Sequence, residues 1–497
     1  MSRLHPTRTE IISRERLPVV AGQLLDDGWR LALVAAHDDP DQLRVVYCFL
    51  RPVGHRVELT VDVPRSDAWI PTLAHASFPA GRFEREVHDL FGIRPQGHPL
   101  PQRLATHGHW PAGYYPMRHD AGHTPRFGPD ADSYPFIPVE GDGVYEIPVG
   151  PIHAGLIEPG HFRFSVVGET ILQVKARLWF LHRGVEKLFE GRTPAQGLEL
   201  AERISGDTAV GHSLAYTLAV EDALGIEVDD RVRATRALLL EVERLYNHIS
   251  DLGGIANDVG YGIAHAHTQR LRETLLRHNK ALTGHRLLRD GITIGGAQLH
   301  AEPDLDLLRG VTAEVAEVVD ITLANNVVSD RLTGTSPLAP EQALHIGTLG
   351  YVARASGVAI DARADHPMLH IPGFQPVVEE TGDVLARFLV RAREVVAAMQ
   401  IIEVLAPLAA AWSPAPSGVP IATPIEAAAG LGVVEAWRGT LCHRVEIDTS
   451  GTLTRVRTLD PSFLNWPALP VALTNTIVPD FPLTNKSFNQ SYAGNDL

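Results

Sequence analysis

The sequence predicts an α+β protein, in which an N-terminal α/β domain precedes a domain built mainly as an α-helical bundle with flanking β hairpins. Three observations predict this fold class. Short runs rich in branched and apolar residues fill the first part of the chain, as β-strands do. Long stretches with apolar residues three and four apart dominate after residue 144, as in amphipathic helices. At 497 residues, the chain is also longer than one hydrophobic core usually organises.

Residues 1–120 are expected to form the first domain. Runs of branched and apolar residues between turn signals predict strands at 31–37, 43–51 and 56–64. Residues 82–93 are predicted as a helix, since Phe83, Val87 and Leu90 recur at helical spacing. A stretch dense in Pro, Gly and His at 94–120 then indicates an ordered arm without a helix. Residues 121–143 have the composition of a linker.

The second domain is expected at 144–497. Apolar residues at helical spacing predict long core helices at 232–256, 304–325 and 381–405. The first of these should end at Gly253-Gly254, because glycine commonly stops a helix. Strand-like segments around short polar turns predict hairpins at 162–178 and 441–460. Polar residues and a proline interrupt the most apolar late stretch, 395–412, so we expect a buried bundle helix there and not a membrane span.

Composition excludes several classes of function. The formal net charge of −15 argues against nucleic-acid binding, which needs clustered cations. Two cysteines, Cys48 and Cys442, are too few for a disulfide framework or an iron–sulfur cluster. No Walker loop and no G-x-G-x-x-G after a strand is present, so we expect no binding of NAD or another nucleotide by this chain alone.

A set of segments in fixed order carries a family resemblance. The segments "FEREVHDLFGIRPQGHPLPQRL" and "HWPAGYYPMRHD" resemble the small peripheral-arm subunit of respiratory complex I that packs beside its quinone-site subunit. Later segments, among them "GPIHAGLIEPGHFRFSVVGETI", "ERISGDTAVGHSLAY" and "RASGVAIDARADHP", resemble the large subunit of nickel–iron hydrogenases, especially the membrane-bound, energy-converting kind. One polypeptide with both halves resembles the large subunit of formate hydrogenlyase-type hydrogenases.

The resemblance breaks at the residues that would hold the metal. The family's "RxCGxC" motif falls on "RISGDT", where Ser205 and Thr208 replace two cysteines. The family's "DPCxxC" motif falls on "NQSYAG", where Ser491 and Gly494 replace the other two. A nickel–iron centre needs soft thiolates, whereas a hydroxyl is a hard donor and glycine has no side-chain donor. We therefore expect no metal site, although Ser205, Asp207, Thr208 and Ser491 leave an oxygen-ligated Mg²⁺ open as an alternative.

Other residues around this corner match family positions with proposed proton or site-lining roles. Arg438 matches the arginine that overhangs the metal centre, and Asp207 is its candidate ion-pair partner. Glu158 matches a glutamate that passes protons in hydrogenases, and His161 follows it closely. The alternatives are an internal ion pair for Arg438, and a capping carboxylate with a packed histidine for the other two.

A quinone cavity is the second hypothesis for the corner. His153 matches the histidine that faces the quinone headgroup in complex I, but the tyrosine that pairs with it there falls on Gly206. The candidate lining residues are His153, Ser205, Gly206 and Asp207. The segment "DARADHP", with Asp361, Asp365 and His366, predicts either the lining of a polar channel or a solvated turn.

The resemblance implies a subunit of a membrane-associated, complex I-like or energy-converting-hydrogenase-related oxidoreductase. It would dock a small iron–sulfur subunit that holds a four-iron cluster, and both would sit on antiporter-like proton-pumping membrane subunits, at the inner face of the cell membrane. Electron transfer, with quinone as a candidate acceptor, would be coupled to proton movement without nickel. A non-catalytic structural subunit and a hydrogenase with unusual oxygen ligands remain the alternatives.

Overall fold

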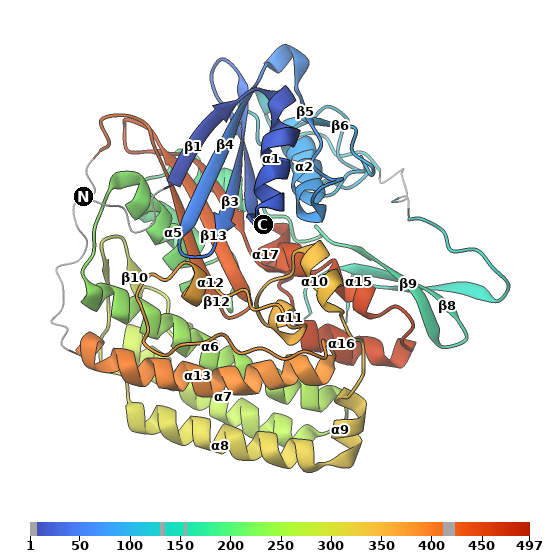
Figure 1. The fold of residues 1–497 in the computed structure, drawn as a ribbon, viewed down its shortest axis with the longest axis vertical. Helices are drawn as coiled ribbons and strands as arrows, with labels where there is room; N and C mark the ends of the chain where they lie inside the picture. Colours follow the sequence, from blue (N-terminus) through green and yellow to red (C-terminus); the bar gives the residue numbers. More distant parts are fainter. Residues whose placement is uncertain (1–6, 130–133, 135, 154–156, 411–422) are drawn as a thin grey trace.

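The N-terminal part is built on a mixed four-stranded sheet, drawn in blue at the top of Figure 1. A computed structural model describes residues 7–129, 134, 136–153, 157–410 and 423–497. The strands lie in the order β1-β4-β3-β2, with β1 parallel to β4 and the other neighbours antiparallel. Their bounds are β1 Thr7–Ile12, β2 Arg30–Asp38, β3 Leu43–Arg51 and β4 His55–Val63. The predicted strands at 31–37, 43–51 and 56–64 are therefore confirmed.

Helices α1 (Leu17–Asp26) and α2 (Phe78–Phe91) accompany this sheet. Helix α2 contains the predicted helical segment but starts earlier, because the Ser77 hydroxyl accepts a hydrogen bond from the Ala80 N–H and Pro79 suits a first turn. It ends at Gly92, whose φ of 73° suits glycine. Short strands β5 (Trp69–Pro71) and β6 (Arg94–Gln96) pair beside it, and residues 97–118 contain no helix or strand, as predicted for the arm.

Long helices form the lower half of the molecule in Figure 1. The two longest, α6 and α13, pack against each other, and α7 and α8 lie below them. The bounds of this group are α6 Asp230–Asp258, α7 Gly262–Thr283, α8 Leu305–Ala324, α9 Asn326–Leu332 and α13 Val384–Ala410. Among the described residues, no helix combines the length and apolarity needed to cross a membrane.

The predicted stop of α6 at Gly253-Gly254 is wrong, since the helix continues to Asp258. Both glycines serve close packing. A Cβ on Gly253 would collide with the hydroxyl of Thr268 on α7, and a Cβ on Gly254 would collide with the side chain of Lys486. Helix α6 therefore keeps two glycines inside it, at a cost in helix propensity, so that neighbouring elements can approach.

Two antiparallel sheets flank the bundle, and both contain a predicted hairpin. The first contains β7 Val144–Val149, β8 His161–Val167 and β9 Thr170–Arg177. The second contains β12 Ala428–Ala436, β13 Gly439–Ile447 and β14 Leu453–Leu459. Helix α5 (Ala209–Leu224) lies directly on β12, because Gly430 and Gly432 have no Cβ to meet its backbone.

The remaining elements are short and connect these layers. The helices are α3 Val185–Phe189, α4 Pro194–Ala201, α10 Pro340–Ile346, α11 Gly350–Ala355, α12 Ala362–Asp365, α14 Ser462–Asn465, α15 Ala468–Ala472, α16 Phe481–Phe488 and α17 Tyr492–Asp496. A two-residue pair, β10 Ile292–Thr293 and β11 Gly296–Ala297, and 3-10 turns at Arg14–Arg16, Arg65–Asp67, His119–Ala121 and Val478–Asp480 complete them.

One hydrophobic core runs from the N-terminal sheet into the C-terminal elements. Phe83 on α2 stacks on Phe463 on α14 with 4.9 Å between ring centroids. An ion pair of 2.6 Å between Arg457 and Glu86 lies buried beside this contact. The two parts thus fold against each other, while the boundaries 1–120 and 144–497 stay a prediction. Part of the predicted linker, 130–133 and 135, lies outside the described residues.

Candidate functional site

Loops from distant parts of the chain meet around a cavity of about 790 Å³. The loop before α5, the turn between β12 and β13, and the segment that begins α17 supply its inner end. The predicted site residues that line it are His153, Glu158, Ser205, Gly206, Asp207, Arg438 and Ser491. The structure therefore brings most of the candidate residues to one place, whereas His161, Thr208 and Gly494 are absent from the lining.

An ion pair between Arg438 and Asp207 forms the inner end. Both guanidinium Nη atoms donate to the Asp207 carboxylate, at 2.6 and 2.7 Å, and Arg438 Nε donates to the Asn489 carbonyl at 2.8 Å. Burial alone would raise the pKa of Asp207, but the charge and hydrogen bonds of Arg438, with those of the Thr208 and Ser205 hydroxyls, lower it to about 2. The internal ion pair suggested by the sequence is confirmed.

The hydroxyl groups that stand at the positions of the family's cysteines form hydrogen bonds with one another and with Asp207. Ser205 Oγ lies 2.9 Å from Ser491 Oγ, and Ser205 and Thr208 each donate to Asp207 Oδ1 at 3.0 Å. Asp207 Oδ1 therefore accepts three hydrogen bonds, counting that from Arg438. Among the described residues, no group of three or more His, Cys, Asp or Glu side chains is placed to hold a metal ion.

The fourth cysteine position, Gly494, faces the carboxylate of another residue. A Cβ on Gly494 would collide with Asp460, which is buried. Asp460 Oδ2 lies 3.1 Å from His212 Nε2, and Asp460 Oδ1 accepts the Ser462 N–H at 2.8 Å. The Gly494 N–H itself donates to Ser491 Oγ at 2.9 Å. The space next to position 494 is thus filled by a hydrogen-bonded side chain.

Two of the candidate quinone and proton residues, His153 and Glu158, also line the cavity, whereas His161 lies outside its lining. His153 Nε2 is 2.8 Å from the Gly160 carbonyl, so this ring nitrogen is engaged by the backbone. Glu158 is exposed, and its Oε2 accepts the Ala493 N–H at 3.1 Å. His161 Nδ1 is 3.2 Å from the Gly150 carbonyl. Glu158 and His161 therefore have separate partners, although they are close in sequence.

Several lining residues were not among the sequence candidates. Asp258 and His265 belong to the α6–α7 corner, and Lys486, Asn489 and Tyr492 come from the C-terminal segment. Burial raises the pKa of Asp258, against the opposing charges of Lys486 and His265. Asp258 lies in the segment "ANDVG" at the end of α6, and this acidic residue at a helix end could have indicated a site residue from the sequence. Lys486 had no such signal, because only the packing along Gly254 brings it to the cavity.

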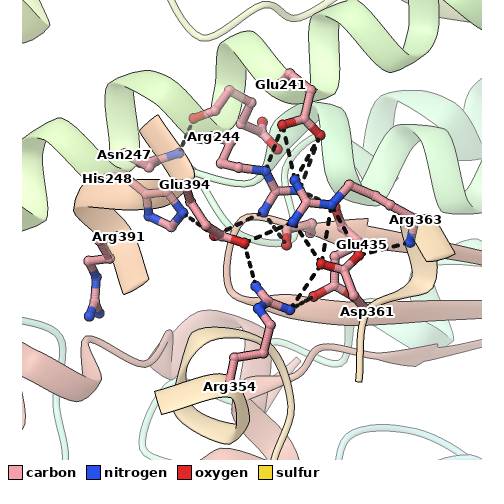
Figure 2. Close-up of polar contacts among 12 residues, drawn as sticks. Glu241, Arg244, Asn247, His248, Arg354, Asp361, Arg363, Arg391, Glu394 and Glu435 are labelled. Atoms are coloured by element: carbon pink, nitrogen blue, oxygen red, sulfur yellow. Dashed lines mark hydrogen bonds and ion pairs between the residues drawn. The ribbon is translucent and has the colours of Figure 1, made fainter. Parts of the chain in front are cut away.

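The prediction of a solvated turn for "DARADHP" is wrong. Asp361 is fully buried and His366 is 4 % exposed. Figure 2 shows Asp361 inside a network of ion pairs in which carboxylates and guanidiniums alternate. Arg354 donates to Glu394 at 2.8 Å and to Glu435 at 2.7 Å, while Arg363 donates to Asp361 at 2.7 Å and to Glu394 at 2.8 Å. The partners Arg354, Glu394 and Glu435 come from other elements, which is why the local sequence looked like a surface turn.

The network, defined as Glu241, Arg244, His248, Arg354, Asp361, Arg363, Glu394 and Glu435, lies close to the inner end of the cavity. His248 Nε2 is 2.7 Å from Glu394, and its ring meets Trp437 edge-on with 6.0 Å between centroids. Trp437 Nε1 donates to the Asp207 carbonyl at 3.0 Å, and its ring lies 4.0 Å below the Arg438 guanidinium. Trp437 therefore separates the open ion pair from the closed network.

Comparison with known proteins places the chain in a family. Residues 11–126 match the respiratory-chain NADH dehydrogenase 30 kDa subunit, residues 258–411 match the 49 kDa subunit, and residues 183–251 match the nickel-dependent hydrogenases. Formate hydrogenlyase subunit 5 of Escherichia coli is 35 % identical over 457 residues, covering 89 % of this chain and 78 % of the relative. The chain belongs to this family of fused complex I-type and hydrogenase-type large subunits.

Other family members include both complex I-type and respiratory proteins. The C/D fusion protein of NADH-quinone oxidoreductase from Bacteroides thetaiotaomicron is 32 % identical over 403 residues, covering 74 % of this chain and 75 % of the relative. A solved chain of an archaeal respiratory complex, the membrane-bound sulfane sulfur reductase, matches 73 % of this chain and 100 % of its own length, with a TM-score of 0.65 and 26 % identity. The expected family resemblance is confirmed.

Proposed function

We propose that this chain is the acceptor-site subunit of a membrane-associated oxidoreductase complex. Electrons from an iron–sulfur cluster on a small partner subunit would reduce a quinone-type acceptor in the cavity, and membrane partners would couple this to proton movement. The observation that carries the proposal is the ion pair of Arg438 with Asp207 at the inner end of a 790 Å³ cavity. The names of the relatives, which include a formate hydrogenlyase, an NADH-quinone oxidoreductase and a membrane-bound reductase, support it.

A nickel–iron centre does not fit the residues present. Hydroxyl groups are hard donors that stay protonated at neutral pH, and here Ser205 and Thr208 already donate to Asp207. The guanidinium of Arg438 occupies the carboxylate that a cation would need. Gly494 offers no side chain, and Asp460 stands against it. This argument also weighs against the Mg²⁺ alternative and against a hydrogenase with oxygen ligands.

The residues at the inner end suit a neutral acceptor with hydrogen-bond-accepting oxygens. Ser491 offers a hydroxyl, since its neighbour Ser205 donates its own proton to Asp207, and Arg438 fixes the position of Asp207. Because its pKa is about 2, Asp207 stays ionised at neutral pH and holds the arginine, whereas Asp258 has a raised pKa and is the better proton carrier of the two. The acceptor would therefore be bound by other residues than the histidine–tyrosine pair that binds quinone in complex I, since Gly206, at the position of that tyrosine, lacks a side chain.

Binding of a decyl-chain benzoquinone to the purified complex tests the proposal. We expect binding, which is measured by the quenching of tryptophan fluorescence. In Arg438→Gln the affinity should fall by about tenfold or more, because one charge-assisted hydrogen bond contributes about this much to binding. Arg277→Gln is the matched control, because Arg277 is 81 % exposed on α7. Absence of quinone binding to the wild-type complex would contradict the proposal.

A non-catalytic structural subunit is the second candidate. It is favoured by the engagement of His153 with the Gly160 carbonyl, which removes one ring nitrogen from the cavity. Measuring proton transport by the assembled complex that carries Glu158→Gln distinguishes the acceptor-site subunit from the structural subunit. Loss of transport in a complex that still assembles supports an active path, and unchanged transport together with absent quinone binding supports the scaffold.

A further inference from the structure

Three polar side chains form a hydrogen-bonded chain behind the inner end of the cavity. Asp460 Oδ2 lies 3.1 Å from His212 Nε2, and His212 Nδ1 lies 3.1 Å from His443 Nε2. His443 Nδ1 is 3.4 Å from the hydroxyl of Thr458. None of the three is more than 1 % exposed. Two imidazoles and a carboxylate are costly to bury unless their hydrogen bonds and charges are matched.

The hydrogen-bond pattern allows two arrangements that differ by one proton. An ionised carboxylate only accepts, so His212 Nε2 must carry hydrogen. In the first arrangement His443 Nε2 donates to His212 Nδ1, and the Thr458 hydroxyl donates to His443 Nδ1. In the second, His212 carries hydrogen on both nitrogens, and His443 donates from Nδ1 to Thr458. No heavy atom has to move between them, and the proton is exchanged with water.

The charges around the chain favour the arrangement with the extra proton. Arg438 is the cation facing Asp460 from the cavity side, and it is already paired with Asp207. One guanidinium thus faces two carboxylates, which leaves one negative charge unmatched. Glu243, which also faces Asp207, has a pKa raised to about 8 by burial, so it is mainly neutral near pH 7 and adds little to this count.

The groups that flank the chain leave His212 as the residue that holds the extra proton. Burial would raise the pKa of Asp460, but the hydrogen bond and charge of His212 and the charge of Arg438 lower it, so this carboxyl is ionised. Burial, together with the charge of His212, lowers the pKa of His443 well below its ordinary value. Tyr216 on α5, 6.2 Å from His443 between ring centroids, is kept neutral by its burial.

We propose that the Asp460–His212–His443 chain is a proton-binding site that holds one exchangeable proton behind the inner wall of the cavity. The site does not depend on the identity of the acceptor. If the proposed function holds, negative charge gained by an acceptor near Arg438 would strengthen proton binding at His212, because the two share one poorly screened region. The absence of a side chain at Gly494 is what leaves room for Asp460 in this position.

Nuclear magnetic resonance of the full chain labelled with ¹⁵N-histidine tests the site without any acceptor. The signals of His212 are identified by their loss in His212→Gln, with His278→Gln on α7 as the control for a buried histidine elsewhere. We expect His212 to carry hydrogen on both nitrogens near neutral pH, and to lose one of them in Asp460→Asn.

A wild-type His212 with hydrogen on a single nitrogen throughout the range in which the chain stays folded would overturn the proposal. If His212→Gln does not fold, Thr458→Val identifies the signals of the Asp460–His212–His443 chain instead, since it shifts the His443 signals while nearly conserving side-chain volume. Failure of quinone binding would leave this result untouched, so the two proposals fail separately.

Discussion

The open ion pair of Arg438 with Asp207 and the closed network around Glu394 use the same chemistry in different surroundings. In the network drawn in Figure 2, the side chains of Arg354, Glu394 and Glu435 are fully buried. At the cavity, Arg438 is 4 % exposed but Asp207 is 37 % exposed. A charge pair sealed on all sides fixes the fold, whereas one that opens on a cavity remains available to a ligand.

The network is held by mutual dependence. Glu394 accepts from Arg354 and Arg363 and lies beside His248, and the two arginines lower its pKa far below the usual range in spite of burial. Burial and the charge of Asp361 instead raise the pKa of Glu435. These residues come from α6, α11, α12, α13 and β12, so the network ties the helical bundle to the sheet.

Breaking the network should give the largest effect. Arg354→Met leaves Glu394 and Glu435 without their shared cation, and we expect the free energy of unfolding to fall by about 3–5 kcal/mol. Urea unfolding followed by circular dichroism measures it. Arg277→Met, at an exposed position, should change the same quantity by no more than about 0.5 kcal/mol. A network variant as stable as this control would show that the closed cluster does not hold the fold.

Breaking the open pair should cost less. Arg438→Gln removes the bidentate partner of Asp207, but that carboxylate can be hydrated from the cavity, so we expect a loss of about 1–3 kcal/mol in the free energy of unfolding. The same urea measurement applies. A loss equal to that of Arg354→Met would mean that Asp207 behaves as a sealed charge, and the comparison between the two regions would fail.

Two glycines at the corner provide a matched pair. A Cβ on Gly494 meets the Asp460 carboxylate, whereas one on Gly206 has no heavy atom within 4 Å. We expect Gly494→Ala to lower the unfolding free energy by about 1–3 kcal/mol through overpacking, and Gly206→Ala to change it by less than about 0.5 kcal/mol. Equal effects of the two substitutions would contradict the position given to Asp460.

The smallest effect concerns pH. The pKa of Asp207 is lowered from 3.8 to about 2 in the folded protein. A lowered pKa stabilises the fold above the unfolded value, and this contribution is lost as the pH falls through the folded value. The stability difference between wild type and Asp207→Asn should therefore be constant near neutral pH and shrink between about pH 4 and pH 2. A stability difference that grows on acidification would contradict the lowered pKa of Asp207.

The sequence predicted those features whose signal is local. The strands at 43–51 and 56–64, both hairpins and the helix at 304–325 follow from patterns within a few residues. The end of α6 was missed because the reason for Gly253 lies on α7. Asp361 was misjudged because its partner Arg354 belongs to a different helix.

The site was predictable to the extent that the family motifs name it. Ser205, Asp207, Arg438 and Ser491 do line one cavity. The part played by Asp460 was not predictable, since it depends on the missing side chain of Gly494 and on His212. Packing between distant segments is not encoded in any single motif.

The nickel content of the purified complex shows whether an arginine–carboxylate corner stands where the family's metal centre would be. Elemental analysis should be made on the complex assembled in cells supplied with nickel, with a nickel–iron hydrogenase prepared in parallel as the positive control. We expect nickel far below one atom per chain. Nickel in a stoichiometric amount, retained through purification, would contradict it.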